Sequence, residues 1–511
     1  MTGGDYRTRR TALTFASGLF VTAATLLVAF VTTPLILRWL GPERFGAARA
    51  AADWFGHLSI LEFGVGGALA PLLAIELGRG NAAGVRATMA EGVRAFMRVA
   101  LFAVLGGVLI TLLIGRLVPV SPELLRDLRI GCVINVLGLL LFPMAPFRTL
   151  LSAGQRGYAV SIAGLVQSLV TTSLAVLFAW LGLGIRGQFA AWVTGQALFA
   201  AIIVRLAQHR HPGGLGAESG PARQTARAAI RKLSVPSLLF DLSSRAGLLT
   251  DNIVVALVLG PAAVVPLFLT QRLTSLAQLQ LQGVGGASWA ALGELHALGR
   301  REVFNTRLVE LTRLVAALAT IVLIPIAAYN HLFIGLWIGA SHYGGPVVTA
   351  FATVNAFLLA LVSLWGYCFS GTGQIAVMVP AMIVGAVLNV ALSVGGAYLF
   401  GVAGPLLGTC VAIASTTLWY LPVQLRRRFG TNLGALARAV VMPLLWAALP
   451  AAGIVFVAKH HPPASWPALG LHGAAAGLLL LSVWWFGELR ADERAHYAER
   501  VRMVLPGRRE S

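Results

Sequence analysis

The chain has 511 residues, of which 57% are hydrophobic and only 11% are charged, and its formal net charge is +20. So few charged residues cannot cover a soluble protein of this length, which excludes a soluble globular fold and a nucleic-acid-binding domain. Three cysteines lie in apolar runs without metal-ligand spacing: Cys132, Cys368 and Cys410. We expect them to be small buried side chains, and we expect neither a metal nor a cofactor.

Apolar runs of about 20 residues, each long enough to cross a bilayer as a helix, follow one another along the chain. They do not alternate as the strands of a membrane β-barrel do. The sequence therefore predicts an all-α polytopic membrane protein of fourteen transmembrane helices: 11–37, 46–77, 93–115, 128–152, 157–181, 184–207, 233–259, 262–292, 303–328, 344–370, 375–400, 402–424, 436–457 and 466–487. The runs 46–77 and 262–292 are long, which predicts tilted or broken helices.

Basic residues are distributed unequally between the two sides of these helices. Of the 39 Lys and Arg residues, 29 fall on the side that holds both chain ends, eight on the opposite side and two inside spans. This asymmetry predicts that both termini are cytoplasmic. The excess charge then faces anionic lipids at the cytoplasmic surface.

A weak internal repeat has an offset of 219 positions. "GVGGA" occurs at 64–68 and 283–287, "LGP" at 40–42 and 259–261, and "GQ" at 154–155 and 373–374. The repeat predicts a duplicated unit of six helices, and an even number makes the two copies parallel. The predicted organisation is an N-terminal lobe (1–208), a basic cytoplasmic linker (209–232), a C-terminal lobe (233–425), two additional helices (426–487) and a basic cytoplasmic tail (488–511).

The glycines of the repeated pentapeptide have two interpretations. They are Gly64, Gly66 and Gly67 in the first copy and Gly283, Gly285 and Gly286 in the second. Small residues let helices approach closely, and they also let a helix bend. The sequence supports packing and hinge roles about equally.

The first copy also resembles a known family. "LGPERFG" and "LEFGVGG" are similar to the turn and the following helix of bacterial polysaccharide flippases, members of the multidrug/oligosaccharidyl-lipid/polysaccharide exporter superfamily, with Glu62 where Asp is more usual. "TDNIVVALVLGPAAVVPLF" resembles the opening of that family's second lobe. The resemblance implies a V-shaped, two-lobed transporter that moves lipid-linked oligosaccharides to the outer leaflet. A polysaccharide polymerase and glycosyltransferases would then be its partners in cell-surface polysaccharide biosynthesis.

Three alternatives remain open. Lipid II flippases and drug or cation antiporters belong to the same superfamily. An integral-membrane glycosyltransferase or polymerase needs an acidic catalytic residue outside the membrane, where Glu123 and Asp127 are the acidic pair of one short loop. Paired with neighbouring arginines, these carboxylates favour an ordinary loop, so we expect a transporter rather than an enzyme.

Ionisable residues within the predicted spans are few, and such residues are usually functional. They are Asp53, His57, Glu62, Asp241, Arg245, Asp251 and Arg272. Because guanidinium groups grip phosphate with two hydrogen bonds, we expect Arg245 and Arg272 to bind the pyrophosphate of the substrate. The carboxylates and His57 are candidates for gating or ion coupling. Asp53 and Arg272 occupy equivalent repeat positions, which suggests a gate in which their opposite charges meet.

Overall fold

The computed structural model describes residues 24–25, 27–62, 64–154, 156–210, 223–231, 250–491, 493–495 and 498. The described residues form helices joined by short turns, and none of them lies in a β-strand. Nine helical stretches of the described chain are long and apolar enough to cross a membrane. The predicted all-α, multi-pass fold is confirmed, whereas the count of fourteen spans stays a prediction. Contacts divide the chain into two compact units, Met1–Val265 and Pro266–Ser511.

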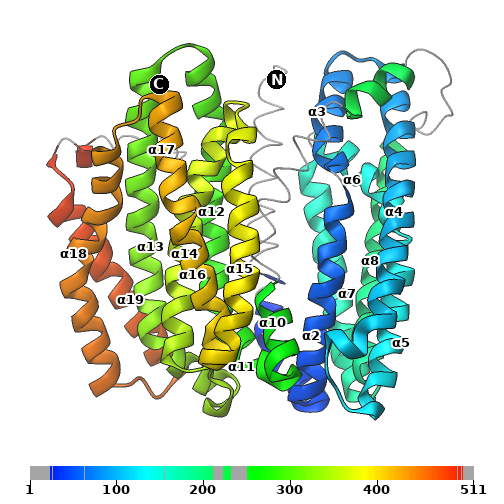
Figure 1. Cartoon of the computed structure of the whole chain (residues 1–511), viewed down its shortest axis with the longest axis horizontal. Helices are drawn as coiled ribbons and strands as arrows, with labels where there is room; N and C mark the ends of the chain where they lie inside the picture. Colours follow the sequence, from blue (N-terminus) through cyan, green and yellow to red (C-terminus); the bar gives the residue numbers. More distant parts are fainter. Residues whose placement is uncertain are drawn as a thin grey trace, which may run out of the picture. The chain divides into compact units, whose positions relative to one another are not determined.

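Unit 1 is a bundle of antiparallel helices, several of which run its full length (Figure 1). Leucine and phenylalanine side chains from α3, α4 and α6 fill its core, including Leu69, Phe96 and Leu150. Its elements are the helix Leu27–Leu40, α2 (Pro42–His57), η1 (Leu58–Glu62), α3 (Val65–Gly78), α4 (Ala82–Leu117), α5 (Pro122–Leu139), η2 (Phe142–Met144), α6 (Ala145–Ala153), α7 (Gly157–Trp180), α8 (Gly184–Arg210), α10 (Thr250–Leu259) and η3 (Pro261–Ala263).

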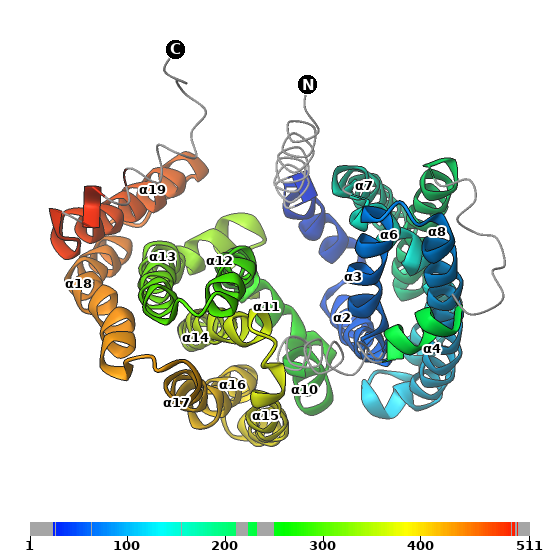
Figure 2. The ribbon, with the colours of Figure 1, turned by 90° about the horizontal axis from the view of Figure 1, so that it is seen from above.

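Unit 2 is built around α13, with helices packed on several sides of it (Figure 2). Its main core lies between α12, α13, α14 and α17 and includes Phe304, Trp365 and Phe369. Its elements are α11 (Val264–Thr270, which begins two residues before the unit boundary), α12 (Arg272–Ala297), α13 (Arg301–Trp337), η4 (Ala340–His342), α14 (Pro346–Gly371), η5 (Ile375–Val377), α15 (Val379–Phe400), η6 (Gly401–Ala403), α16 (Gly404–Ser415), α17 (Thr417–Phe429), α18 (Leu433–His460), α19 (Trp466–Ser482) and the π-helix η7 (Val483–Glu488).

The two "LGP" turns adopt the same local structure. Gly41 has φ 79° and ψ 161° directly before α2, and Gly260 has φ 92° and ψ 159° directly before η3. A positive φ is accessible to glycine at little cost, and the proline that follows in each copy suits the first position of a helix. The repeated tripeptide therefore specifies one turn twice.

Both long apolar runs are interrupted, as their length suggested, but at positions that are not equivalent in the repeat. The first run breaks between His57 and Val65, where a 3-10 turn leads to Gly64 at φ 67°. The second run breaks earlier in its copy, at Gln271 between α11 and α12. In the first copy, the residues that correspond to Gln271 lie inside the continuous helix α2.

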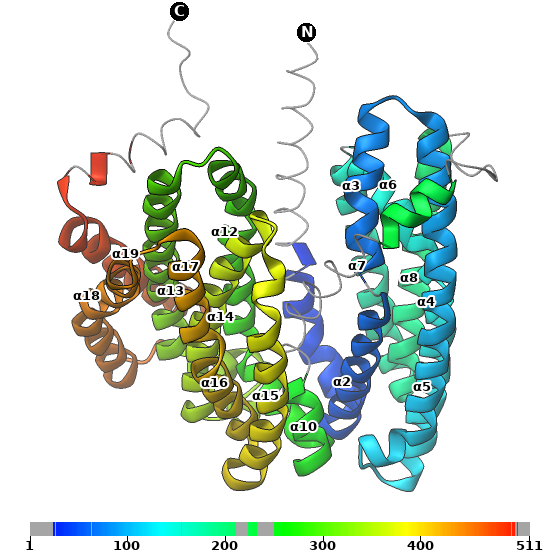
Figure 3. The same ribbon diagram turned by 45° about the horizontal axis from the view of Figure 1, so that its top comes forward.

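Part of the predicted cytoplasmic linker is a helix packed on unit 1. The short helix 223–231 lies beside α4 (Figure 3), and its Ile230 joins the core formed by α3, α4 and α6. Arg223 of this helix and Arg94 of α4 both form ion pairs with the buried Glu91. The linker is therefore partly a component of the first bundle.

The boundary between the compact units lies after the predicted linker. Residues 250–265 belong to the predicted C-terminal lobe (233–425), yet α10 and η3 pack against α2 in unit 1. Gly46 of α2 makes this contact close, because a β-carbon there would overlap the carbonyl oxygen of Pro261. The boundaries of the two predicted lobes stay predictions.

Candidate functional site

A buried carboxylate lies inside α2 with both of its oxygens bound. The side chain of Asp53 is 4% exposed, and its Oδ1 lies 3.2 Å from Nη2 of Arg49, one helical turn earlier. Its Oδ2 accepts a hydrogen bond of 2.8 Å from the Asn252 side chain of α10. A buried charge is tolerated when it is paired and hydrogen-bonded in this way. The cluster therefore holds a charge pair inside an apolar bundle and ties α2 to α10.

His57 is bound to the backbone of Asp53 rather than to its carboxylate. Its Nδ1 lies 2.8 Å from the Asp53 carbonyl oxygen. Because a carbonyl only accepts hydrogen bonds, this contact places a proton on Nδ1 and leaves Nε2 as the acceptor of the neutral ring. The ring of Trp54 lies 6.3 Å away, centroid to centroid. The predicted one-face relationship between Asp53 and His57 is real, but the atoms that meet differ.

Two members of this cluster were not among the candidates from the sequence. Arg49 was counted among the residues of an external loop, but it lies inside α2, four positions before Asp53. That spacing is the one local signal that could have identified it, since residues four apart share a helix face. Asn252 carries no charge and is distant in sequence, so the stretch that contains it, "TDNIVVALVLGPAAVVPLF", did not link it to Asp53.

The first "GVGGA" copy lies at the break between α2 and α3. Gly64 has the left-handed conformation that favours glycine, and it precedes the first residue of α3. A β-carbon on Gly66 would lie 3.4 Å from the Glu62 carboxylate, which stands at the end of the 3-10 turn. Gly67 is part of α3. A break here is consistent with a bend, and the hinge role of these glycines stays a prediction.

The second copy lies inside the continuous helix α12. A β-carbon on Gly285 would stand 2.8 Å from Cδ2 of Tyr367 and 3.1 Å from Cα of Leu364, both on α14. Gly286 faces Tyr367 at a longer distance, and Gly283 has open space around it. Close packing of α12 on α14 explains Gly285. The same five letters thus serve a helix break in one copy and a helix contact in the other.

Arg272 is the first residue of α12, directly after the break at Gln271. Its guanidinium carbon lies 5.7 Å from the centroid of the Phe268 ring, a cation–π distance. The position of this joint is fixed by Thr270, whose Oγ1 accepts a hydrogen bond of 2.8 Å from the Gly344 amide. Its carbonyl oxygen accepts one of 2.9 Å from the fully buried Asn330. Arg272 is therefore presented from a rigid joint.

The remaining candidates are only partly described. Asp251 lies in the first turn of α10, next to the Asn252 that binds Asp53. Asp241 and Arg245 fall outside the described residues. In the described part of the chain, no group of three or more His, Cys, Asp or Glu residues is arranged to hold a metal ion.

Asp127, one of the two acidic residues considered for a catalytic role, caps the start of α8. Oδ2 of Asp127 accepts a hydrogen bond of 2.6 Å from the Ile185 amide in the first turn of α8. Its Oδ1 lies 3.6 Å from Nε of Arg186. A carboxylate at this position satisfies amides that the helix cannot pair itself. Glu123 is exposed in the first turn of α5. The geometry gives Asp127 a structural role.

The sequence of the chain matches a known family over more than half of its length. The profile of the family described as polysaccharide biosynthesis protein matches residues 14–290. The chain belongs to this family. The membership confirms the resemblance drawn from the turn at Gly41 and the motif at Gly64. No curated protein matches the chain.

Solved structures of transporters share the fold of this polysaccharide biosynthesis protein. The structure of the lipid II flippase MurJ in an inward closed conformation has a TM-score of 0.68 and 13% identity, covering 92% of this chain and 100% of that one. An inward-facing multidrug transporter of the MATE family, in the MOP superfamily, has a TM-score of 0.64 and 15% identity, covering 82% and 99%. An outward-facing MATE structure has a TM-score of 0.57 at 15% identity, covering 84% and 97%. The polysaccharide family member therefore has the fold of MOP-superfamily transporters.

Proposed function

We propose that the chain is a flippase that moves a polyprenyl-pyrophosphate-linked oligosaccharide from the inner to the outer leaflet of the bacterial cytoplasmic membrane. The observation that carries the proposal is the family match over residues 14–290, on a chain whose fold is shared with a lipid II flippase. The family match supports a polysaccharide precursor as the substrate. The fold shared with transporters supports translocation by alternating access.

The substrate needs cations for its phosphates and an apolar route for its lipid. Arg272 suits the first need, because its guanidinium remains protonated and the network at Thr270 fixes the start of its helix. In this proposal Arg245 is the second phosphate ligand. A phosphate at this position would add charge-assisted hydrogen bonds to the contact that Arg272 makes with the Phe268 ring.

The charge pair on α2 is the proposed coupling element. A state change that separates Arg49 from Asp53 would leave a buried carboxylate uncompensated, which is strongly unfavourable unless a cation or proton replaces the arginine. His57, Glu62, Asp241 and Asp251 are the further candidates for this role. The gate between Asp53 and Arg272 stays a prediction from the repeat. A charge swap tests it, since an inward-facing population that is lost in Asp53→Arg and in Arg272→Asp should return in the double variant, whatever the variant does to substrate binding.

Orientation and partners follow from the same proposal. Both termini are cytoplasmic, the basic surface faces anionic lipids, and a polysaccharide polymerase and glycosyltransferases act before and after translocation. An enzymatic role is the weaker alternative, because Asp127 is used as a helix cap.

A deletion strain distinguishes the candidate functions. A polysaccharide flippase predicts loss of surface polysaccharide, accumulation of lipid-linked oligosaccharide in the inner leaflet, and rescue by the plasmid-borne gene. Lysis with accumulated lipid II would instead identify a lipid II flippase. Unchanged polysaccharide together with increased drug sensitivity would identify an antiporter and overturn the proposal.

A further inference from the structure

The candidate membrane span Trp466–Glu488 ends in contact with α13. At the end of α19 the backbone changes to the π-helix η7 (Val483–Glu488). Trp484 and Leu489, which are 8% and 2% exposed, pack with the fully buried Ala317 of α13. We call the described residues 483–491 and 493 the strap. Its apolar residues cover the part of α13 that lies toward the predicted cytoplasmic end.

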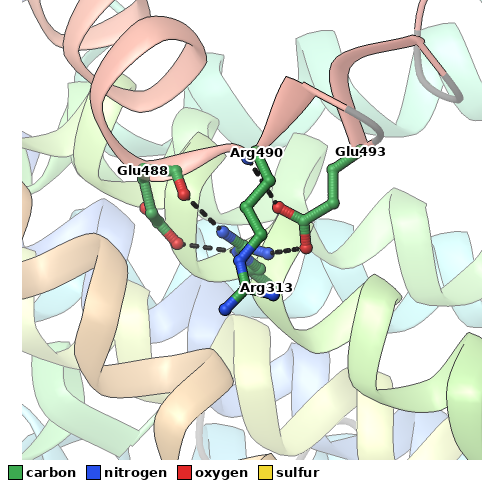
Figure 4. A network of polar contacts seen from close by, with 4 residues as sticks. All are labelled: Arg313, Glu488, Arg490 and Glu493. Carbon is green, nitrogen blue, oxygen red and sulfur yellow. Dashed lines mark hydrogen bonds and ion pairs between the residues drawn. The ribbon is translucent and has the colours of Figure 1, made fainter.

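One arginine of α13 binds the strap at three points (Figure 4). Nε of Arg313 donates to Oε1 of Glu488 at 2.7 Å, and Nη2 donates to the Glu488 carbonyl oxygen at 3.1 Å. Nη1 donates to Oε1 of Glu493 at 2.6 Å. The planar fork of a guanidinium satisfies three acceptors from a single side chain, which a lysine cannot do in the same geometry. Arg313 is therefore a specific anchor.

The anchor is withdrawn from solvent and has more negative than positive charge. The side chain of Glu488 is 2% exposed and that of Arg313 is 20% exposed. The second oxygen of Glu493 accepts a hydrogen bond of 2.9 Å from the Arg490 amide, which holds the strap in its turn. Without Arg313, two neighbouring carboxylates would lose their shared cation, and one of them is buried. Removing one partner of a buried pair is strongly destabilising.

The helices before the strap are held mainly by α13. Both α18 and α19 pack on it through a cluster that includes Tyr329, Ile454 and Leu480. Most of the surface of α18 and α19 is apolar and outside the core, as Leu449 (83% exposed) and Leu471 (70% exposed) illustrate. Lipid tails solvate such surfaces as well as other helices do, so burial alone gives little driving force for association. The hydrogen bonds from Arg313 to the strap provide a specific attachment that apolar packing in lipid does not provide.

We propose that the strap fastens the C-terminal helices α18 and α19 to α13 through Arg313, so that the three helices move as one body. The strap is thus a conformational device of unit 2, with Arg313 as its positioning residue. The proposal goes beyond the proposed flippase function and does not depend on it, because attachment of the strap is measurable without transport.

Hydrogen exchange on the full-length protein in nanodiscs tests the attachment. Arg313→Gln should accelerate exchange of the strap amides by at least about tenfold, since a buried pair is broken, while α14 keeps its protection. The matched control is Arg307→Gln, because Arg307 lies on the same helix but pairs with Glu310 at 2.7 Å. It should leave strap exchange unchanged. Equal exchange in wild type, Arg313→Gln and Arg307→Gln would overturn the proposal.

A second measurement covers the outcome in which Arg313→Gln does not fold. In Leu489→Cys, the new thiol should resist maleimide, and the three natural cysteines are buried and give little background. Adding Glu488→Gln and Glu493→Gln removes both carboxylates and leaves the arginine near the membrane edge, where it can be hydrated. Labelling of Cys at position 489 should then increase at least about tenfold, as expected when an ion-pair network is lost. Unchanged labelling in that variant would also refute the strap.

Discussion

The side-chain amide of Asn252 donates a hydrogen bond of 2.8 Å to the carboxylate of Asp53, joining residues 199 positions apart. The contact fixes α10 to α2 and satisfies the oxygen that Arg49 does not reach. A neutral donor and a cation thus share one buried anion. Both oxygens of the buried carboxylate are therefore bound, one by a charged group and one by a neutral amide.

Replacing Asn252 by Ala should lower the stability of the protein by about 1–3 kcal/mol, the usual cost of leaving a buried acceptor unsatisfied. Asn252→Asp should be worse, because two carboxylates would then compete for Arg49. Thermal unfolding in detergent measures both changes. In the Asp53→Asn background, the loss caused by Asn252→Ala should become smaller, and equal losses in the two backgrounds would show that the hydrogen bond contributes nothing.

The second pentapeptide offers a matched pair of substitutions within one turn of α12. Gly283→Ala should be neutral or stabilising by up to about 1 kcal/mol, because alanine is the better helix former and the site is open. Gly285→Ala should cost about 1–3 kcal/mol, since the new methyl group meets Tyr367 and the Leu364 backbone. Unfolding temperatures of the two variants check this. The same effect in both would exclude close packing as the reason for Gly285.

Substitution of Gly64 should be unfavourable because of its backbone conformation, whereas substitution of Gly285 is limited by packing. Its φ of 67° costs an alanine about 1–2 kcal/mol, so Gly64→Ala should lower stability or straighten the break between α2 and α3. Gly64→Asn should be milder, because asparagine tolerates this conformation better. If the break acts as a hinge, transport by Gly64→Ala should fall more than its stability does. Flipping rates compared at matched folded fractions separate the two effects.

Asp127→Ala should destabilise the protein by about 0.5–2 kcal/mol through loss of the cap on α8. Transport measured per folded molecule should remain near wild type. Glu123→Ala is the control, since that side chain is exposed, and it should change neither quantity. A complete loss of function in folded Asp127→Ala would revive the enzymatic alternative.

Arg272→Ala should abolish transport without loss of folded protein, and Arg245→Ala should do the same. Arg272→Lys should restore only part of the activity, because lysine keeps the charge but loses the bidentate fork. Flipping of a fluorescent polyprenyl-pyrophosphate glycolipid in proteoliposomes provides the measurement. Wild-type rates in both alanine variants would remove the arginines from the substrate site.

Local features of the fold could be predicted because they depend on neighbouring residues. The turn at Gly41 and Pro42 needs only a glycine that accepts positive φ and a proline that begins a helix. Burial of Cys132, Cys368 and Cys410 follows from the apolar runs around them. The interruptions of 46–77 and 262–292 could be anticipated from length alone. Their different positions in the two copies could not, because identical pentapeptides are compatible with both structures.

Contacts between distant segments were beyond the sequence. The stretch "TDNIVVALVLGPAAVVPLF" contains Asn252, but nothing in it indicates a contact with Asp53, which exists only because α10 lies against α2. The tail after α19 was open to a surface helix or a solvated segment, whereas Glu488 and Glu493 meet Arg313 of a helix that begins far earlier in the chain. Arg49 lies within the predicted span 46–77, and it was counted on the external side only because it is close to the start of that span.

The close packing of α10 and η3 on α2 places residues 250–265 in a different unit from the one that the repeat predicts. In the predicted repeat, residues 250–265 belong to the second copy, since Gly260 and Pro261 correspond to Gly41 and Pro42. By packing, they complete the first bundle, where Gly46 leaves room for the Pro261 carbonyl. A chain cut between 211 and 222 would leave the helix 223–231 and the segment 250–265 on the second fragment, although both belong to the first compact unit. The first bundle would therefore be complete only after residue 265 has been synthesised.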